Sequence, residues 1–325
     1  MSEVSPEYRP EQLEVMTAMV TPFHRDGSLN LDGAQELADY LVENGSDGLV
    51  LAGTTGESPT LTMDEQVSLF VAVADAVDGR AALIGGTGSN STLEAVELTH
   101  RATELEVLDG LLVVSPYYNR PSQNGIKRYY EAVAGATELP VILYNIPVRT
   151  GREVSFDTIS ELFEAEKIDA VKDATGGVDM ARKLHDAYGY EIDVYSGEDA
   201  QNLDYLRVGA IGAISVMSHW AGNAMRHQFD AFLRGDVRTA EKIDALLRPS
   251  AQYESVHEWP EGVSWETPNP HPAKAMMSHI LGQGAIGLCR SPMEIEDEEL
   301  AYLLERAPQI LDDLDQGLRD MGLVA

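Results

Sequence analysis

The sequence predicts an α/β protein built as a (β/α)8 barrel, or TIM barrel, with a C-terminal helical subdomain. Eight short apolar stretches alternate with segments of helical spacing between Val15 and about Gly235. Near-continuous apolar strands in regular alternation with helices indicate a parallel sheet covered on both faces. Eight such units close a barrel. A doubly wound open sheet is the alternative, but no Gly-x-Gly-x-x-Gly motif follows the first strand.

The eight expected strands are short, and turn residues or a helix start follow most of them. They span residues 15–21, 47–52, 81–84, 109–114, 140–144, 168–172, 192–195 and 210–216. Helical spacing follows at 31–44, with Asp32 as the expected N-cap, and from about Asp64, Ser91, Gly125 and Ser155. The glycine-rich run 85–88 follows strand three instead of strand seven or eight, so we interpret it as close backbone packing and not as a phosphate cradle.

Three regions are expected along the chain. Residues 1–12 are polar and contain proline, which predicts a flexible N-terminal arm. Residues 13–235 form the barrel. Residues 236–325 form the helical subdomain, with helices at 237–247, 272–281 and 297–321 and a long surface loop at 249–272 that holds five prolines.

The net charge of the chain is −31, from 54 acidic and 23 basic residues. Such a surface excludes nucleic acids and anionic membranes as partners. The acids are spread through every helical segment and form no tail. We therefore interpret the charge as adaptation of the surface to high salt, where screening removes self-repulsion. Ordinary acidic solubility is the alternative interpretation.

The cysteine and histidine content indicates the redox compartment of the protein and argues against metal-dependent catalysis. The single cysteine, Cys289, allows no internal disulfide and fits a reducing cytoplasm. No stretch resembles a signal peptide or is long enough to span a membrane, so we expect a cytoplasmic protein. The eight histidines are scattered, which argues against a metal-dependent enzyme.

Lys172 is the candidate nucleophile. It ends the apolar strand 168–172, and Gly176 and Gly177 then turn the chain away. The other five lysines precede a strand or lie in helical, polar-flanked segments: Lys127, Lys167, Lys183, Lys242 and Lys274. Burial disfavours a charged ammonium and lowers its pKa, which is what an amine needs to attack a ketone and form a Schiff base. The alternative is a lysine that reaches the surface or pairs with a carboxylate.

Further polar residues follow other strands at their carboxyl ends, where the chemistry of barrels is located. They are Thr54 and Thr55 after strand two, Tyr117 and Tyr118 after strand four, and Tyr144 and Arg149 at and after strand five. Taken singly, the threonines could form only a tight turn and the tyrosines only packing. Together, hydroxyls could relay the protons of Schiff-base chemistry, and a guanidinium could hold a substrate carboxylate.

Four segments resemble a known family in order and in spacing. They are Gly53-Thr-Thr-Gly-Glu-Ser58, Pro116-Tyr-Tyr-Asn-Arg-Pro-Ser122, Tyr144-Asn-Ile-Pro-Val-Arg-Thr-Gly151 and Val171-Lys-Asp-Ala-Thr-Gly176. The family is that of dihydrodipicolinate synthase, among the pyruvate-dependent class I aldolases that include N-acetylneuraminate lyase. The likeness runs from about Met19 to Val216 and resumes at Pro268-Asn-Pro-His-Pro-Ala-Lys274.

The resemblance implies condensation of pyruvate with aspartate 4-semialdehyde, on the diaminopimelate route to lysine, without a cofactor. It implies that Lys172 forms the Schiff base and that Tyr144 is the acid/base beside it. Thr54 and Tyr118 look like the other members of the proton relay, with Tyr118 arriving from a neighbouring subunit. The remaining matched positions bind substrate: Thr55 and Ile214 contact pyruvate, Gly197 lines the same mouth, and Arg149 holds the semialdehyde carboxylate. The family is usually a homotetramer, built as a pair of tight dimers.

Two other functions remain open from the residues. A 2-keto-3-deoxy sugar-acid aldolase would share pyruvate and Lys172 but accept glyceraldehyde. The bulky run Val216-Met-Ser-His-Trp220 keeps it open, whereas Arg149 and Thr54 favour the synthase. A non-catalytic binding barrel is less compatible with the full set of polar residues.

Feedback by lysine is expected to be weak or absent. Some relatives bind the inhibitor through histidines on the helix after Gly-Thr-Thr-Gly, and here those positions carry Met63 and Gln66. Asn90, Glu94 and Tyr117 match the rest of that site.

Overall fold

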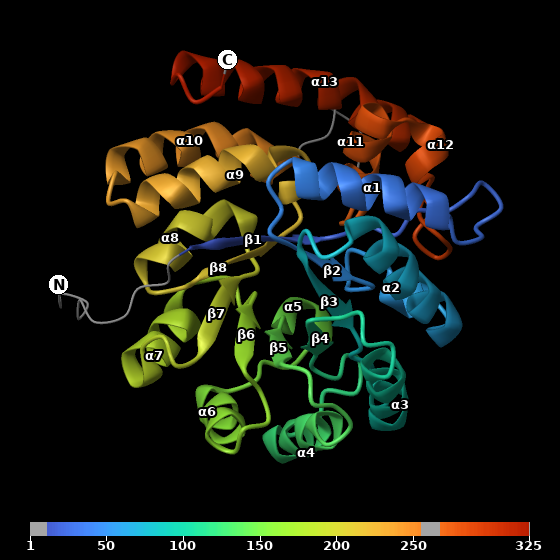
Figure 1. Ribbon diagram of the computed structural model, residues 1–325, viewed down its shortest axis with the longest axis vertical. Coiled ribbons are helices and arrows are strands. Elements are labelled where there is room, and N and C mark those ends of the chain that lie inside the picture. The colour runs from blue at the N-terminus through green and yellow to red at the C-terminus, as the bar shows by residue number, and fades with distance from the viewer. Residues whose placement is uncertain (1–11, 255–266, 325) are drawn as a thin grey trace.

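The computed structural model describes residues 12–254 and 267–324, and its centre is a closed barrel of eight parallel strands in sequence order (Figure 1). This confirms the predicted fold class. The strands are β1 Glu14–Ala18, β2 Gly48–Leu51, β3 Ala82–Gly86, β4 Gly110–Val114, β5 Val141–Asn145, β6 Ala170–Asp173, β7 Asp193–Ser196 and β8 Gly212–Ser215.

At least one helix follows each strand, and all of them except the short α5 cover the outside of the barrel. These helices are α1 Leu31–Glu43, α2 Met63–Val77, α3 Thr92–Thr103, α4 Gln123–Ala134, α5 Pro147–Thr150, α6 Phe156–Glu164, α7 Asp179–Tyr188, α8 Asn202–Arg207 and α9 Ser218–Leu233. Short 3₁₀ turns occur at Ser58–Thr60 and Asp199–Gln201. The first helix starts as predicted, but its N-cap is Asn30 instead of Asp32: the Asn30 side chain accepts the Gly33 N–H at 3.0 Å. Asn30 stands one residue before the helix, where a side-chain oxygen can reach a free amide, whereas Asp32 already lies within it.

The side chains of each strand alternate between the barrel interior and the surrounding helices. In β5, Tyr144 belongs to the apolar cluster inside the barrel and Leu143 to the cluster beneath the helices. In β6, Ala170 faces inward and Val171 outward. Lys172 has the parity of Ala170, so its side chain enters the barrel.

The glycines at and after the end of β3 permit close backbone packing, as predicted. A Cβ atom on Gly86 would lie 2.4 Å from the Ala52 carbonyl oxygen, and one on Gly88 would lie 2.4 Å from the Val114 nitrogen. Any larger residue would therefore push neighbouring strands apart.

Four further helices follow the barrel: α10 Val237–Glu254, α11 His271–Leu281, α12 Gln283–Ile286 and α13 Asp297–Asp320. In Figure 1, α13 is the outermost of them and packs on α10 and α11. Among the described residues, no helix has both the length and the apolar composition needed to cross a bilayer.

The predicted bounds of the loop at 249–272 are wrong at both ends. Helix α10 continues through Pro249 to Glu254, and α11 begins at His271. Pro249 is exposed, whereas Leu247, Ser250 and Tyr253 continue the buried face of the helix. The Tyr253 hydroxyl also donates to a carbonyl of α13 at 2.9 Å. This burial outweighs the backbone hydrogen bond that a proline removes. Residues 255–266 of the expected loop, and 1–11 of the expected arm, lie outside the described residues. The division at residue 235 into barrel and subdomain stays a prediction.

Candidate active site

Lys172 and Tyr144 are neighbours across two strands. The register of β5 and β6 pairs Tyr144 with Lys172, and both side chains enter the barrel. The Lys172 Nζ lies 4.4 Å from the centroid of the Tyr144 ring. The Tyr195 side chain is next in register, but its hydroxyl donates to Glu14 at 2.6 Å. Tyr144 is therefore the phenol best placed to serve the amine.

The Lys172 amine has the environment that a Schiff-base nucleophile needs. Its side chain is buried, and burial lowers its pKa to about 8. Asp199, Glu254 and Glu198 act in the opposite direction through their charge. Within the described part of the chain no carboxylate forms an ion pair with this amine, so near neutral pH more of it is unprotonated than of an ordinary lysine.

Tyr144 is buried, and burial raises the pKa of its phenol well above the ordinary value. The nearby Arg149 charge and a side-chain hydrogen bond with Thr54 lower it in part. The phenol is therefore neutral and able to donate its proton to a bound group and take one back. The structure thus brings Thr54, Tyr144 and Lys172 together.

Gly197 and Ile214 line the same space. A Cβ atom on Gly197 would lie 3.1 Å from Cε of Lys172 and 2.8 Å from Cβ of Ala174. Any side chain here would crowd the amine, so the position requires glycine. Ile214 is buried in β8 and belongs to the same interior cluster as Tyr144.

Arg149 and Tyr118 lie farther out. Arg149 is exposed on the short helix α5, and its charge reaches both Tyr144 and Lys172. Tyr118 is 88% exposed and has a left-handed backbone with φ of +69°. A phenol this exposed is not enclosed in the barrel that carries it.

Thr55 lies on a loop that the C-terminal region holds in place. Its hydroxyl accepts a hydrogen bond from Asn269 Nδ2 at 2.9 Å, and the Thr21 hydroxyl donates to the Gly56 carbonyl at 2.6 Å. Glu57 has a left-handed backbone, φ +56°, and its carboxylate pairs with Lys274 Nζ at 2.6 Å. Lys274 lies on a helix, as predicted, but it is also buried, which the sequence did not indicate, and Glu57 supplies the opposite charge.

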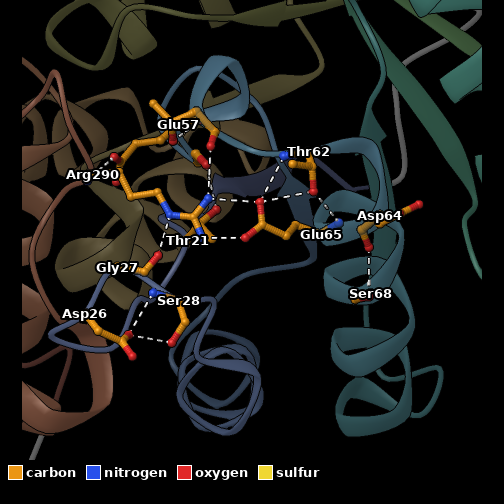
Figure 2. Close-up of polar contacts among 12 residues, drawn as sticks. Thr21, Asp26, Gly27, Ser28, Glu57, Thr62, Asp64, Glu65, Ser68 and Arg290 are labelled. Atoms are coloured by element: carbon orange, nitrogen blue, oxygen red, sulfur yellow. Dashed lines mark hydrogen bonds and ion pairs between the residues drawn. The ribbon is translucent and has the colours of Figure 1, made fainter.

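Arg290 fastens the far side of the same loop (Figure 2). Its backbone N–H donates to the second Glu57 oxygen at 2.9 Å, and its guanidinium donates to the Gly27 and Thr60 carbonyls and to Glu65. That contact lowers the pKa of Glu65 to about 2. The loop that carries Thr54 and Thr55 is therefore braced by charged side chains from outside the barrel.

Asp199, two residues after Gly197, was not predicted as a site residue. The Asp199 carboxylate accepts the backbone N–H groups of Val216 and Met217, both at 2.8 Å. It thereby joins the loop after β7 to the start of α9. An acid directly after a barrel strand was the available signal. Glu254, another charge that acts on Lys172, was missed because it falls in the expected loop.

The bulky residues after strand eight are accommodated by packing. His219 is fully buried: its Nε2 accepts the Val20 N–H at 3.1 Å, and its Nδ1–H donates to the Val216 carbonyl at 2.7 Å. Burial lowers its pKa to about 4, so it is neutral. Trp220 packs edge-on against Tyr253 of α10, with ring centroids 5.8 Å apart. Their size therefore carries no argument for a changed substrate.

Comparison with known proteins places this chain in a family. The family model described as the dihydrodipicolinate synthetase family matches residues 11–308. The 4-hydroxy-tetrahydrodipicolinate synthase of Synechococcus sp. is 42% identical over 312 residues, which cover 96% of this chain and 94% of that protein.

Solved structures agree as well. The 4-hydroxy-tetrahydrodipicolinate synthase of Methylacidiphilum fumariolicum superposes with a TM-score of 0.84 at 35% identity, covering 96% of this chain and 99% of that one. The chloride-inhibited dihydrodipicolinate synthase of Acinetobacter baumannii, complexed with pyruvate, gives 0.79 at 33% identity and covers 96% and 99%. With matching fold, length and sequence, this chain belongs to the dihydrodipicolinate synthetase family.

Proposed function

We propose that this protein is a 4-hydroxy-tetrahydrodipicolinate synthase, a lyase of the class I type that condenses pyruvate with aspartate 4-semialdehyde in lysine biosynthesis. The observation that carries the proposal is the buried Lys172 amine, with its pKa of about 8, beside the Tyr144 ring. An amine of this kind is suited to form a Schiff base with the keto group of pyruvate.

The residues divide the reaction between them. The Lys172 amine attacks C2 of pyruvate, and loss of water leaves an iminium. Removal of a proton from C3 gives an enamine, which attacks the aldehyde carbon of the semialdehyde. The substrate's own amine then displaces Lys172 from C2 and closes the ring. Tyr144, with Thr54, gives and takes the protons of these steps.

The substrate carboxylates need cationic or hydrogen-bonding partners. Thr55 serves the pyruvate carboxylate, beside Gly197 and Ile214. Arg149 serves the carboxylate of the semialdehyde, and its exposure leaves the guanidinium free to reach a ligand at the mouth.

The assembly we propose is a homotetramer in the cytoplasm. The 88% exposure of Tyr118 supports it, since this phenol is available to complete the proton relay of a neighbouring subunit. Lysine inhibition is proposed to be weak or absent because Met63 and Gln66 replace histidines. A requirement for high salt stays a prediction from the charge of −31.

The test is pyruvate consumption in molar KCl with two aldehydes side by side, aspartate 4-semialdehyde and glyceraldehyde. Strong preference for the semialdehyde supports the synthase and gives Arg149 its carboxylate. Preference for glyceraldehyde would assign the protein to sugar-acid cleavage instead. Borohydride with pyruvate is the companion measurement: it must inactivate the protein and leave one reduced adduct, on Lys172.

A further inference from the structure

We propose that Asn269 is a positioning residue, which orients the Thr55 hydroxyl so that its proton faces the carboxylate of pyruvate. The inference rests on the proposed function, since it assigns pyruvate to this site. Asn269 comes from the segment before α11, far along the chain from the loop after β2. The C-terminal region would then take part in substrate binding without touching the substrate.

The geometry of one hydrogen bond carries the argument. Asn269 Nδ2 lies 2.9 Å from Thr55 Oγ1 and donates to it. A threonine hydroxyl has one proton to give and two lone pairs to receive. Because an amide N–H can only donate, it occupies a lone pair of Oγ1, and the Thr55 proton must point elsewhere. In the described part of the chain, Asn269 is the one protein group hydrogen-bonded to this hydroxyl.

Both partners are held firmly enough to set a direction. Thr55 is 3% exposed, so its hydroxyl is shielded from bulk water. Two residues before Asn269, the Thr267 hydroxyl donates to Glu299 of α13 at 3.0 Å and anchors the segment. Five residues after it, Lys274 pairs with Glu57 at 2.6 Å and anchors the loop to the same segment. The contact between Thr55 and Asn269 therefore lies between two anchoring contacts, Thr267 with Glu299 and Lys274 with Glu57.

A Thr55 hydroxyl with a fixed direction can donate its proton to a substrate carboxylate. The residue before Thr55 is Thr54, whose side chain acts on Tyr144 beside Lys172. A proton aimed into that space is offered to a carboxylate oxygen of the keto acid, and a hydrogen bond to a charged acceptor is stronger than one between neutral groups. Loss of the direction weakens the binding of pyruvate and leaves the later steps intact.

The experiment measures steady-state kinetics of the full-length protein with both substrates varied. Asn269→Ala is expected to raise KM for pyruvate about tenfold, the loss of one hydrogen bond to a charged group. The value of kcat and KM for the semialdehyde should change less than about twofold on the same basis. Asn269→Leu, which keeps the volume without the donor, is the second variant should the alanine protein not fold.

Thr267→Val is the matched control. It removes a buried hydrogen bond of the same segment but keeps the Asn269 amide, so it should lower the melting temperature and raise KM for pyruvate much less than Asn269→Ala does. An equal rise of KM in the control would assign the Asn269 effect to general loosening and overturn the proposal.

A double-mutant cycle with Thr55→Val tests whether Asn269 acts on KM for pyruvate through the Thr55 hydroxyl. If Asn269 acts through the Thr55 hydroxyl, Asn269→Ala changes KM for pyruvate little once Thr55 is valine. Additive effects would overturn the proposal. Borohydride trapping over a range of pyruvate concentrations separates the two hypotheses: failure of the wild type to form an adduct rejects the function, whereas equal half-saturation in wild type and Asn269→Ala rejects only the positioning role.

Discussion

Two buried lysines in this protein have opposite surroundings. Lys172 at the end of β6 and Lys274 on α11 are 5% and 3% exposed. Lys274 Nζ lies 2.6 Å from the Glu57 carboxylate, donates to the Leu288 carbonyl at 3.0 Å and sits over the Phe23 ring. Lys172 has the Tyr144 ring beside it, and the acids that influence it act at longer range.

The difference teaches that burial alone does not make a nucleophile. A buried ammonium with a carboxylate and a carbonyl to bond remains an ammonium, and its attraction to the carboxylate stabilises the folded chain. A buried amine without such a partner loses its proton readily and can attack a carbonyl carbon. Replacing each lysine with methionine, which is similar in length and uncharged, separates the two roles.

The largest effect is expected on catalysis in Lys172→Met. Activity should fall at least about a thousandfold, as for removal of an enzymatic nucleophile. Borohydride and pyruvate should leave no adduct, which intact-protein mass spectrometry detects. An adduct that persists in this variant, or one that maps to Lys274, would end the assignment of Lys172.

Lys274→Met should destabilise the fold by about 3–5 kcal/mol, because it leaves the Glu57 carboxylate buried without its partner. Urea unfolding followed by circular dichroism measures the change. The double variant Lys274→Met with Glu57→Gln should recover part of the loss, since no buried charge remains. An unchanged midpoint in the single variant contradicts the comparison.

Lys172→Met should act in the opposite direction and stabilise the fold at pH 7 by about 1–3 kcal/mol, from the size of the pKa shift. Burial lowers the folded-state pKa from 10.5 to about 8, so the folded protein binds fewer protons than the unfolded chain between these values. The cost of the charged amine is therefore full below pH 8 and falls as the pH rises to 10.5. The advantage of the variant should shrink over that window, and a constant difference would contradict the assignment.

The smallest expected effect is on the pH dependence of trapping. At low pyruvate the initial rate of adduct formation follows the neutral fraction of Lys172, so it should rise about fivefold from pH 7 to 8 and level off above pH 9. Lys274→Met should give the same profile. A rate that still climbs at pH 10 would indicate an ordinary lysine.

The barrel and the core of the candidate site were predictable because their signals are local. Short apolar strands alternate with helices, and Lys172 and Tyr144 each lie next to the end of a strand, so parallel register places them side by side. Thr54 and Gly197 follow from motifs at the same edge.

The second lysine was not predictable, because its partner Glu57 lies far away in the sequence and only the fold brings the two together. The same holds for Asn269 and Thr55. Pro249 predicted a loop, but buried contacts of the residues around it keep the helix intact. Local propensity does not predict such contacts, because they form between segments that are distant in the sequence.

The pairing of β1 with β8 has a consequence for co-translational folding. The barrel can close only after residues 212–215 have been synthesised, and Asn269, Lys274 and Arg290 emerge later still. Lys172 is therefore synthesised before the residues that hold the loop after β2 in place. The contacts that hold the Thr54–Thr55 loop are therefore completed only in the final quarter of translation.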